Sequence, residues 1–180
     1  MQQHSVYDPI IIIFCFIVSK YLITTGEMGY GTYGYKSEII DLSISGNYHC
    51  PYWINPIDTY GATGGLLGTT PIICGGLALE CHTITKRESK PIETTTTTFK
   101  RIFAASVMIN DEVLWVSGGE DYTWLVWDLL SSTEFIQLDG ITQGPDLPMA
   151  LKHHAMINMN DGRTMVIGGY SKVDVHTFSS

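Results

Sequence analysis

Short apolar runs that end in paired glycines recur along the chain. Their first glycines stand 43 and 50 residues apart, and a degenerate copy places Thr25 in the same slot another 50 residues upstream. An alanine stands thirteen residues before each of the three first glycines. A pattern that keeps its internal spacing predicts a series of similar structural units. The runs are PIICGG (71–76), LWVSGG (114–119) and TMVIGG (164–169), with YLITTG (21–26) as the degenerate copy.

Each copy has the hydrophobic pattern of a β-hairpin. In the third copy, residues 104–109 predict one strand, Asn110-Asp111 a turn, and residues 113–117 an apolar return strand. The second and fourth copies repeat this pattern within 64–74 and 156–167. The return strands are apolar on both faces, which predicts burial between neighbouring sheets. A further strand is predicted after each glycine slot, at 37–42, 80–85, 133–138 and 173–178.

These residues resemble the kelch repeat, above all that of the divergent kelch-like propeller proteins of invertebrates. The resemblance lies in WVSGG (115–119), the link GPDLP (144–148) and MVIGGY (165–170), and it covers residues 21–180. It implies an all-β fold, a partial kelch-type β-propeller of about four blades whose last blade is truncated. The implied blades are residues 21–58, 59–100, 101–150 and 151–180.

The paired glycines have a structural role in this interpretation. Glycine adopts positive φ easily and lets two backbones approach closely, as where a strand leaves the crowded centre of a ring. No glycine pair continues into a phosphate-binding loop motif. The glycines concerned are Gly75, Gly76, Gly118, Gly119, Gly168 and Gly169.

Kelch propellers bind other proteins through loops on one face, so the resemblance implies a non-enzymatic protein–protein interaction module whose partner is an unknown protein. Tyr122, Trp124 and Trp127 are candidate contact residues. Their segment is either a strand that buries one tryptophan or a loop that exposes the aromatic rings. An unclosed propeller leaves edge strands unpaired, which favours a homo-oligomer.

An enzyme is the competing class, because some propellers of this fold are galactose-oxidase-like copper oxidases. Such a site needs two His, two Tyr and a Cys at the ring centre, and nothing in the spacing of His49, His82, His153 and Cys50 selects them. The chain contains no G-x-S-x-G or H-E-x-x-H motif. We therefore assign no catalytic residue, no metal ligand and no cofactor. A truncated, non-functional propeller is the third alternative.

The apolar run of nine residues at 10–18 has two interpretations. It fits the hydrophobic centre of a signal peptide within residues 1–20, or it is a buried strand. It is too short to span a bilayer, which takes about 20 residues. A signal peptide predicts an extracellular, secreted protein, with Cys50 and Cys81 as the candidate disulfide and Cys74 as a core residue. The strand interpretation leaves a cytoplasmic location open.

Composition and charge exclude two further classes. Apolar residues make up 44% of the chain, which excludes a disordered protein. The net charge is −8, from 10 Lys+Arg against 18 Asp+Glu, and no basic cluster exists to bind nucleic acid. The pair His153-His154 is predicted to place its rings on opposite faces of a strand, as core or loop histidines.

Overall fold

The protein is all-β in the part of the chain that the computed structural model describes. This part comprises residues 14–18, 21–25, 28–29, 32–33, 36–41, 52–54, 59–84, 89–123, 126–159 and 161–172. It contains several small antiparallel sheets and no helix. Accordingly, no helix able to cross a membrane occurs among these residues. The predicted strand at 173–178, together with Trp124, His49 and Cys50, lies outside the described residues.

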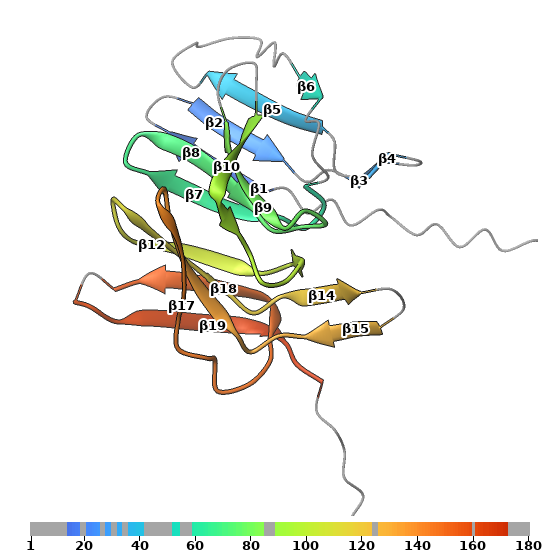
Figure 1. Cartoon of the computed structure of the whole chain (residues 1–180), viewed down its shortest axis with the longest axis vertical. Helices are drawn as coiled ribbons and strands as arrows, with labels where there is room; N and C mark the ends of the chain where they lie inside the picture. Colours follow the sequence, from blue (N-terminus) through green and yellow to red (C-terminus); the bar gives the residue numbers. More distant parts are fainter. Residues whose placement is uncertain are drawn as a thin grey trace, which may run out of the picture.

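Four sheets follow one another along the sequence, and we call them units 1 to 4 (Figure 1). Unit 1 has the order β1-β2-β5-β6: β1 (Phe14–Val18), β2 (Tyr21–Thr25), β5 (Lys36–Asp41) and β6 (Tyr52–Ile54). Unit 2 consists of β7 (Thr63–Leu67), β8 (Thr70–Cys74), β9 (Glu80–Ile84) and β10 (Ser89–Thr96). Unit 3 consists of β12 (Ala105–Asn110), β13 (Val113–Ser117), β16 (Thr133–Gln137) and β17 (Gly140–Gln143). Unit 4 is the hairpin of β18 (Lys152–Asn158) and β19 (Thr164–Tyr170).

The predicted hairpins of the second, third and fourth copies are confirmed as β7–β8, β12–β13 and β18–β19. Two connections between a second and a third strand carry insertions that the sequence pattern did not predict. One is the small hairpin of β3 (Met28–Gly29) and β4 (Thr32–Tyr33) in unit 1. The other lies in unit 3, where β14 (Glu120–Thr123) pairs with β15 (Val126–Leu129) and with β11 (Arg101–Ile102).

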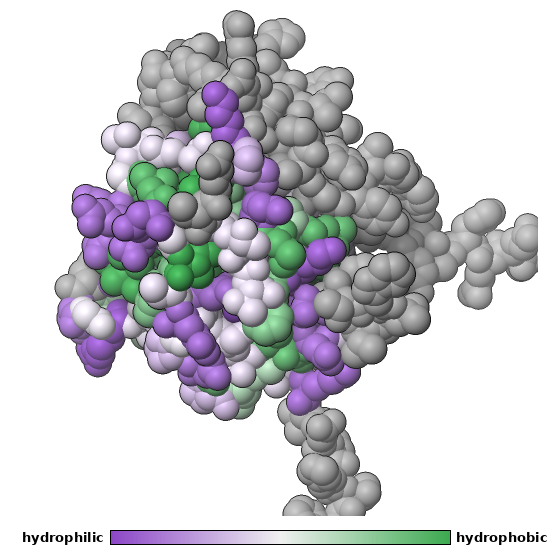
Figure 2. Space-filling model, in the orientation of Figure 1, coloured by the Kyte–Doolittle hydropathy of each residue, from purple (hydrophilic) through white to green (hydrophobic). Residues whose placement is uncertain are grey.

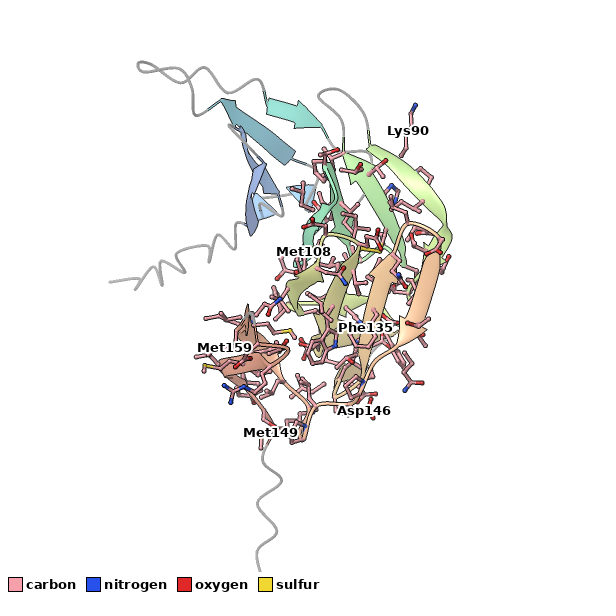
Figure 3. All side chains as sticks on the ribbon, turned by 90° about the vertical axis from the view of Figure 1, so that its left-hand side faces the viewer. Lys90, Met108, Phe135, Asp146, Met149 and Met159 are labelled. Carbon is pink, nitrogen blue, oxygen red and sulfur yellow. A yellow bond between two sulfur atoms is a disulfide. The ribbon has the colours of Figure 1, made fainter. Side chains whose placement is uncertain are left out.

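The first strands of the four units pack against one another in chain order. β1 contacts β7, β7 contacts β12, and β12 contacts β18. Figure 3 shows the sheets following one another along an arc, from unit 1 at the upper left, through units 2 and 3, to unit 4 at the lower left. Each unit therefore meets its neighbours mainly through its first hairpin.

The core lies largely between units 2 and 3. The return strands β8 and β13 are buried there, as the sequence predicts: Ile72 and Leu114 are both 0% exposed. The same prediction is wrong for β19, where Met165 and Ile167 are 45% and 44% exposed. The difference arises because no described element packs on the outer face of unit 4.

The paired glycines adopt the conformations that the sequence predicts. All six have positive φ, from 58° at Gly118 to 101° at Gly169. A Cβ atom on Gly118 would overlap the carbonyl oxygen of Leu151, so glycine is required there for close approach to the next unit. The backbone N–H of Gly119 donates a hydrogen bond of 2.7 Å to that same carbonyl.

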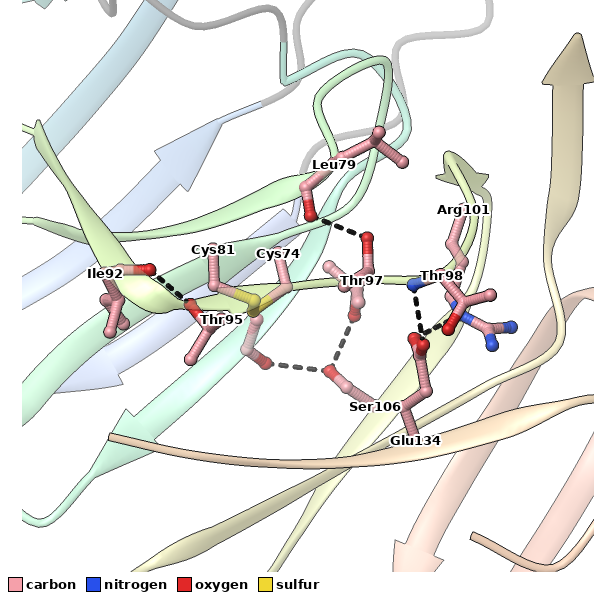
Figure 4. The surroundings of a disulfide bond; sticks show 12 residues. Cys74, Leu79, Cys81, Ile92, Thr95, Thr97, Thr98, Arg101, Ser106 and Glu134 are labelled. Carbon is pink, nitrogen blue, oxygen red and sulfur yellow. Dashed lines mark hydrogen bonds and ion pairs between the residues drawn. A yellow bond between two sulfur atoms is a disulfide. The ribbon is translucent and has the colours of Figure 1, made fainter. Parts of the chain in front are cut away.

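The disulfide differs from the predicted one. Cys81 is bonded to Cys74 and not to Cys50, and each sulfur forms only one such bond (Figure 4). The cause is the pairing of β8 with β9: Ile73 lies opposite His82, which brings the two neighbouring cysteines to a Cα separation of 4.2 Å. Cys74 is nevertheless a core residue, being 1% exposed.

The apolar run near the N-terminus contributes a strand. Phe14–Val18 forms β1, which pairs with β2 in a register that joins Phe14 to Thr25 and Val18 to Tyr21. This matches the strand interpretation of the run. Residues 1–13 lie outside the described part of the chain.

Candidate protein-binding surface

One end of the sheets carries the inserted hairpins, and we call it the hairpin end. It is the end at which β8, β13 and β19 finish and at which β7, β12 and β18 begin. In unit 2 the connection at this end is only residues 75–79, whereas in unit 3 it is residues 118–132 and includes β14 and β15. Figure 1 shows β14 and β15 extending from the sheets toward the right of the view, on the same side as β3 and β4.

The β14–β15 hairpin holds the predicted contact aromatics. Tyr122 lies directly opposite Trp127, whose side chain is 43% exposed. The segment is thus neither the third strand of the unit nor an irregular loop, but an extra hairpin. The structure brings two of the three predicted residues together, and Trp124 lies outside the described residues.

Two carboxylates lie across the same hairpin. Asp121 of β14 is paired with Asp128 of β15, and Asp128 is exposed. Like charges directly opposite one another on a sheet destabilise it, because their repulsion is not relieved by the pairing. A cationic group supplied by a partner would relieve this repulsion. Because adjacent residues of a strand point to opposite faces, the hairpin presents Trp127 on one face and the Asp121–Asp128 pair on the other.

A stack of rings lies at the base of this hairpin. Phe103 meets Tyr60 edge to face with 5.4 Å between ring centroids, and it stacks on His153 at 4.2 Å. These residues occupy equivalent positions before β7, before β12 and within the start of β18, so each of units 2 to 4 contributes one ring. The 43- and 50-residue steps of the glycine pairs also relate Tyr60, Phe103 and His153. Applying those steps upstream of the alanines reveals from the sequence that the three positions are equivalent, but not that their rings are in contact.

The backbone is strained within the stack. Phe103 has a φ of 60° and His153 a φ of 57°, and they are the non-glycine residues with positive φ in the described part of the chain. A bulky residue in this region costs on the order of 1–3 kcal/mol and occurs mainly where structure serves function. Hydrogen bonds hold the arrangement: Phe103 N–H donates to Gly61 O at 2.8 Å, and His153 N–H donates to Phe103 O at 3.0 Å.

Burial and neighbouring charges set the direction in which the pKa of His153 is shifted. Burial lowers the pKa of His153 below its ordinary value, and Lys152 lowers it further, with Glu120 acting in the opposite sense. The Lys152 ammonium forms an ion pair of 2.8 Å with Glu120 and lies 5.5 Å from the centre of the Tyr170 ring. The aromatic stack therefore lies beside a compensated ion pair.

A buried ion pair supports the segment that leads into Phe103. Arg101 and Glu134 are joined at 2.9 Å, and their side chains are 1% and 4% exposed. The Arg101 guanidinium also donates to the carbonyls of Gly118 and Ser132. The backbone N–H of Thr98 donates to Glu134 (Figure 4). This network ties the start of unit 3 to its own third strand. The sequence carries no local signal for it, because Arg101 and Glu134 are 33 residues apart.

The second histidine of the pair points into the protein. His154 is 8% exposed, and its Nε2 lies 2.7 Å from the hydroxyl of Ser117, which donates to the sulfur of Met156. A hydroxyl that donates to sulfur can only accept from His154, so the Nε2–H tautomer fits. Burial lowers the pKa of His154. Ser117 is itself 0% exposed, so this pair joins units 3 and 4 within the interior.

The candidate copper ligands are not brought together where the structure describes them. His82 lies in β9 of unit 2 and His153 in β18 of unit 4. Within the described residues, no group of three or more His, Cys, Asp or Glu is placed to hold a metal ion.

The opposite end of the sheets carries a shallow pocket between units 2 and 3. It lies beside the turns that join β7 to β8, β12 to β13 and β16 to β17. Figure 2 shows apolar and polar residues side by side at this end, on the left of the view. Its lining residues are Leu67, Gly68, Asp111, Glu112, Gln137, Leu138 and Asp139.

Comparison with known proteins assigns this chain to no group: no protein-family model matches it, and no curated protein matches it.

Proposed function

We propose that this protein is a non-enzymatic protein-binding module, built as a partial kelch-type β-propeller, that binds its partner at the hairpin end. Successive four-stranded antiparallel sheets whose first strands pack in series support the propeller architecture. Glycine pairs with positive φ at equivalent places support the kelch type.

The observation that carries the binding site is the Tyr60–Phe103–His153 stack. Three successive units contribute one ring each, and two of the residues are held at positive φ. Strain of this kind is retained where the surface it creates is used. The exposed Trp127, on the inserted hairpin at the same end of the sheets, adds an aromatic contact residue, the type that most often dominates binding energy.

The charge of the hairpin indicates the chemistry of the partner. Asp121 and Asp128 face each other across β14 and β15, and the whole chain has a net charge of −8. The partner is a protein surface that presents an apolar or aromatic side chain to the face with Trp127 and lysine or arginine to the opposite face, where the two aspartates lie. Its binding weakens as salt screens the charges.

Selection from a random peptide display library tests this proposal. We expect enrichment of peptides that combine a basic residue with an aromatic or aliphatic one. Substitution Trp127→Ala should weaken their binding about 30-fold, the loss of about 2 kcal/mol typical of a dominant contact. Leu138→Ala at the opposite end is the matched control, since Leu138 is 51% exposed, and it should leave binding unchanged. Binding that ignores Trp127 would refute the assignment.

We also propose that the protein works in an oxidising, extracellular compartment. The Cys74–Cys81 disulfide supports this, because such bonds persist outside the cytoplasm. A cleaved leader of residues 1–20 would delete β1, so this proposal takes β1 to be retained in the mature chain and rests on the disulfide, not on a removed signal peptide. Intact mass of protein secreted from a eukaryotic host, with and without reduction, separates the two. Free thiols in unsecreted protein would instead favour the cytoplasmic alternative.

A further inference from the structure

The outer face of unit 4 is apolar and uncovered. The β18–β19 register pairs Ala155 with Ile167 and Ile157 with Met165, so these residues share one face of the hairpin. Ile157 is 48% exposed, and Met159, in the same alternation, is 41% exposed. Figure 3 shows the labelled Met159 on unit 4, on the side away from units 2 and 3. A strand added after β19 would pair with its edge and leave this face uncovered.

The equivalent face of unit 3 shows what covers such a surface. Ser117 of β13, which corresponds to Ile167 by the 50-residue step, is 0% exposed because His154 and Met156 of unit 4 lie on it. Unit 2 meets unit 3 in a similar way, with Thr63 and Ser106 hydrogen-bonded at 2.6 Å. The covering element is in both cases the first strand of the following unit.

The first glycine of each pair marks the same junction. A Cβ atom on Gly75 would lie 2.8 Å from the carbonyl oxygen of Arg101, and one on Gly118 would overlap that of Leu151. Both carbonyls belong to the start of the next unit. Gly168 has the same left-handed conformation, with a φ of 66°, yet nothing lies within 4 Å of its Cβ position. Unit 4 therefore has the surface on which a following unit packs, and the described residues contain no such unit.

We propose that the first unit of a second copy of this chain docks on the outer face of unit 4, head to tail. The first strand of unit 1, β1, has the sequence FCFIV, so it is apolar at every position and carries no charge. β1 packs on β7 along one side, as each first strand does with its successor. Its other side is the one that, in units 3 and 4, meets the preceding unit. Unit 1 of one copy and unit 4 of another therefore have complementary surfaces, so the chain can associate with itself.

Sedimentation analysis over a range of concentrations tests this proposal. The wild-type chain should associate beyond its 20.0 kDa monomer. The double substitution Ile157→Lys and Ile167→Lys should leave it monomeric, because charge on the docking face opposes burial. Both side chains are already exposed, so the monomer should keep its fold and its circular dichroism spectrum. Leu138→Lys, at an exposed site in a turn of unit 3, is the control that should still associate.

Cross-linking of a mixture of isotope-labelled and unlabelled chains tests the orientation. Lys36 begins β5 and Lys172 follows β19, and both lie toward the hairpin end of their units. Head-to-tail docking predicts links between Lys36 of one copy and Lys172 of the other. A monomer at all concentrations, association that survives the double substitution, or links joining Lys172 only to Lys172 would each overturn the proposal.

Discussion

In units 2 and 3, the second and third strands are linked at the same position of the repeat by different interactions. In unit 2 the last residue of the second strand and the first buried residue of the third, Cys74 and Cys81, are joined covalently. In unit 3 the equivalent pair is Ser117 and Thr133, which face each other across β13 and β16. Both pairs are at most 1% exposed. The covalent link accompanies a short connection of residues 75–79, and the polar pair accompanies the longer one that contains β14 and β15.

This difference indicates how the fold accommodates an insertion. The disulfide fixes the two strands of unit 2 directly. Unit 3 instead uses Ser117 to bond His154 of the next unit, Thr133 to bond the carbonyl of Pro145, and Arg101 to bond the inserted connection at Gly118 and Ser132. The hairpin that carries Trp127 is thus held at its base by buried polar contacts.

Among substitutions that test this difference between units 2 and 3, removing the charge of Arg101 should lower the free energy of unfolding most. Arg101→Ala leaves Glu134 buried without its partner, which should lower the free energy of unfolding by about 3 to 5 kcal/mol. Urea denaturation monitored by tryptophan fluorescence measures the change. The double substitution Arg101→Met and Glu134→Leu should restore much of the loss, because no unpaired charge remains.

The control for this prediction is the exposed ion pair of Arg163 with Asp161. Arg163→Ala should leave the urea midpoint unchanged, since solvent screens such a pair. Equal effects of Arg101→Ala and Arg163→Ala would mean that the network does not support unit 3.

Cleaving the covalent link of unit 2 should have the next largest effect. The disulfide closes a loop of few residues, so replacing Cys74 and Cys81 by Ala should cost about 2 to 3 kcal/mol of unfolding free energy. Reductant should lower the wild-type protein to the same level and should not affect the double variant. A wild-type chain whose urea midpoint ignores reductant would show that unit 2 does not depend on this bond.

Sequence reasoning recovers the regular part of the fold and not the exceptions to it. The apolar runs and turns of the repeat locate β7–β8, β12–β13 and β18–β19, because hairpins are local and their patterns are short. The Cys74–Cys81 bond could not be selected among four cysteines without the strand pairing. The Arg101–Glu134 pair joins distant residues that carry no shared pattern. The exposure of β19 depends on its lacking a neighbour, which no local sequence encodes.

Lowering the pH should have the third largest effect, a loss of unfolding free energy that arises in units 2 and 4. Burial lowers the pKa values of His82 and His154 below 6.5, and both side chains are at most 8% exposed. Below pH 6.5 the unfolded chain binds protons that the folded chain does not, so stability is full above this pH and falls as pH drops toward the folded pKa values. Each unit of pKa depression corresponds to about 1.4 kcal/mol.

Unfolding free energies at pH 7.5 and pH 5.5 measure this effect. The ring nitrogens of His82 have no hydrogen-bond partner among the described residues, so His82→Phe should flatten the pH dependence without removing a contact. His154→Gln should flatten it as well, and it should also weaken the junction with Ser117. A pH dependence that persists in the double variant would assign it to other groups.

The residues with positive φ at the ring stack give the smallest expected difference in stability between units 2 and 3. In unit 2 the residue with positive φ is Gly61, one position after the ring of Tyr60, whereas in unit 3 it is Phe103 itself. Unit 2 therefore avoids the strain that unit 3 retains.

Both Phe103→Ala and Phe103→Gly remove the ring, but only glycine relieves the backbone. The Gly variant should thus be about 1 kcal/mol more stable than the Ala variant, as urea denaturation of the two would measure. Peptide binding should fall equally in both, because it depends on the ring and not on the strain. An Ala variant as stable as the Gly variant would remove the argument that strain is retained at this surface.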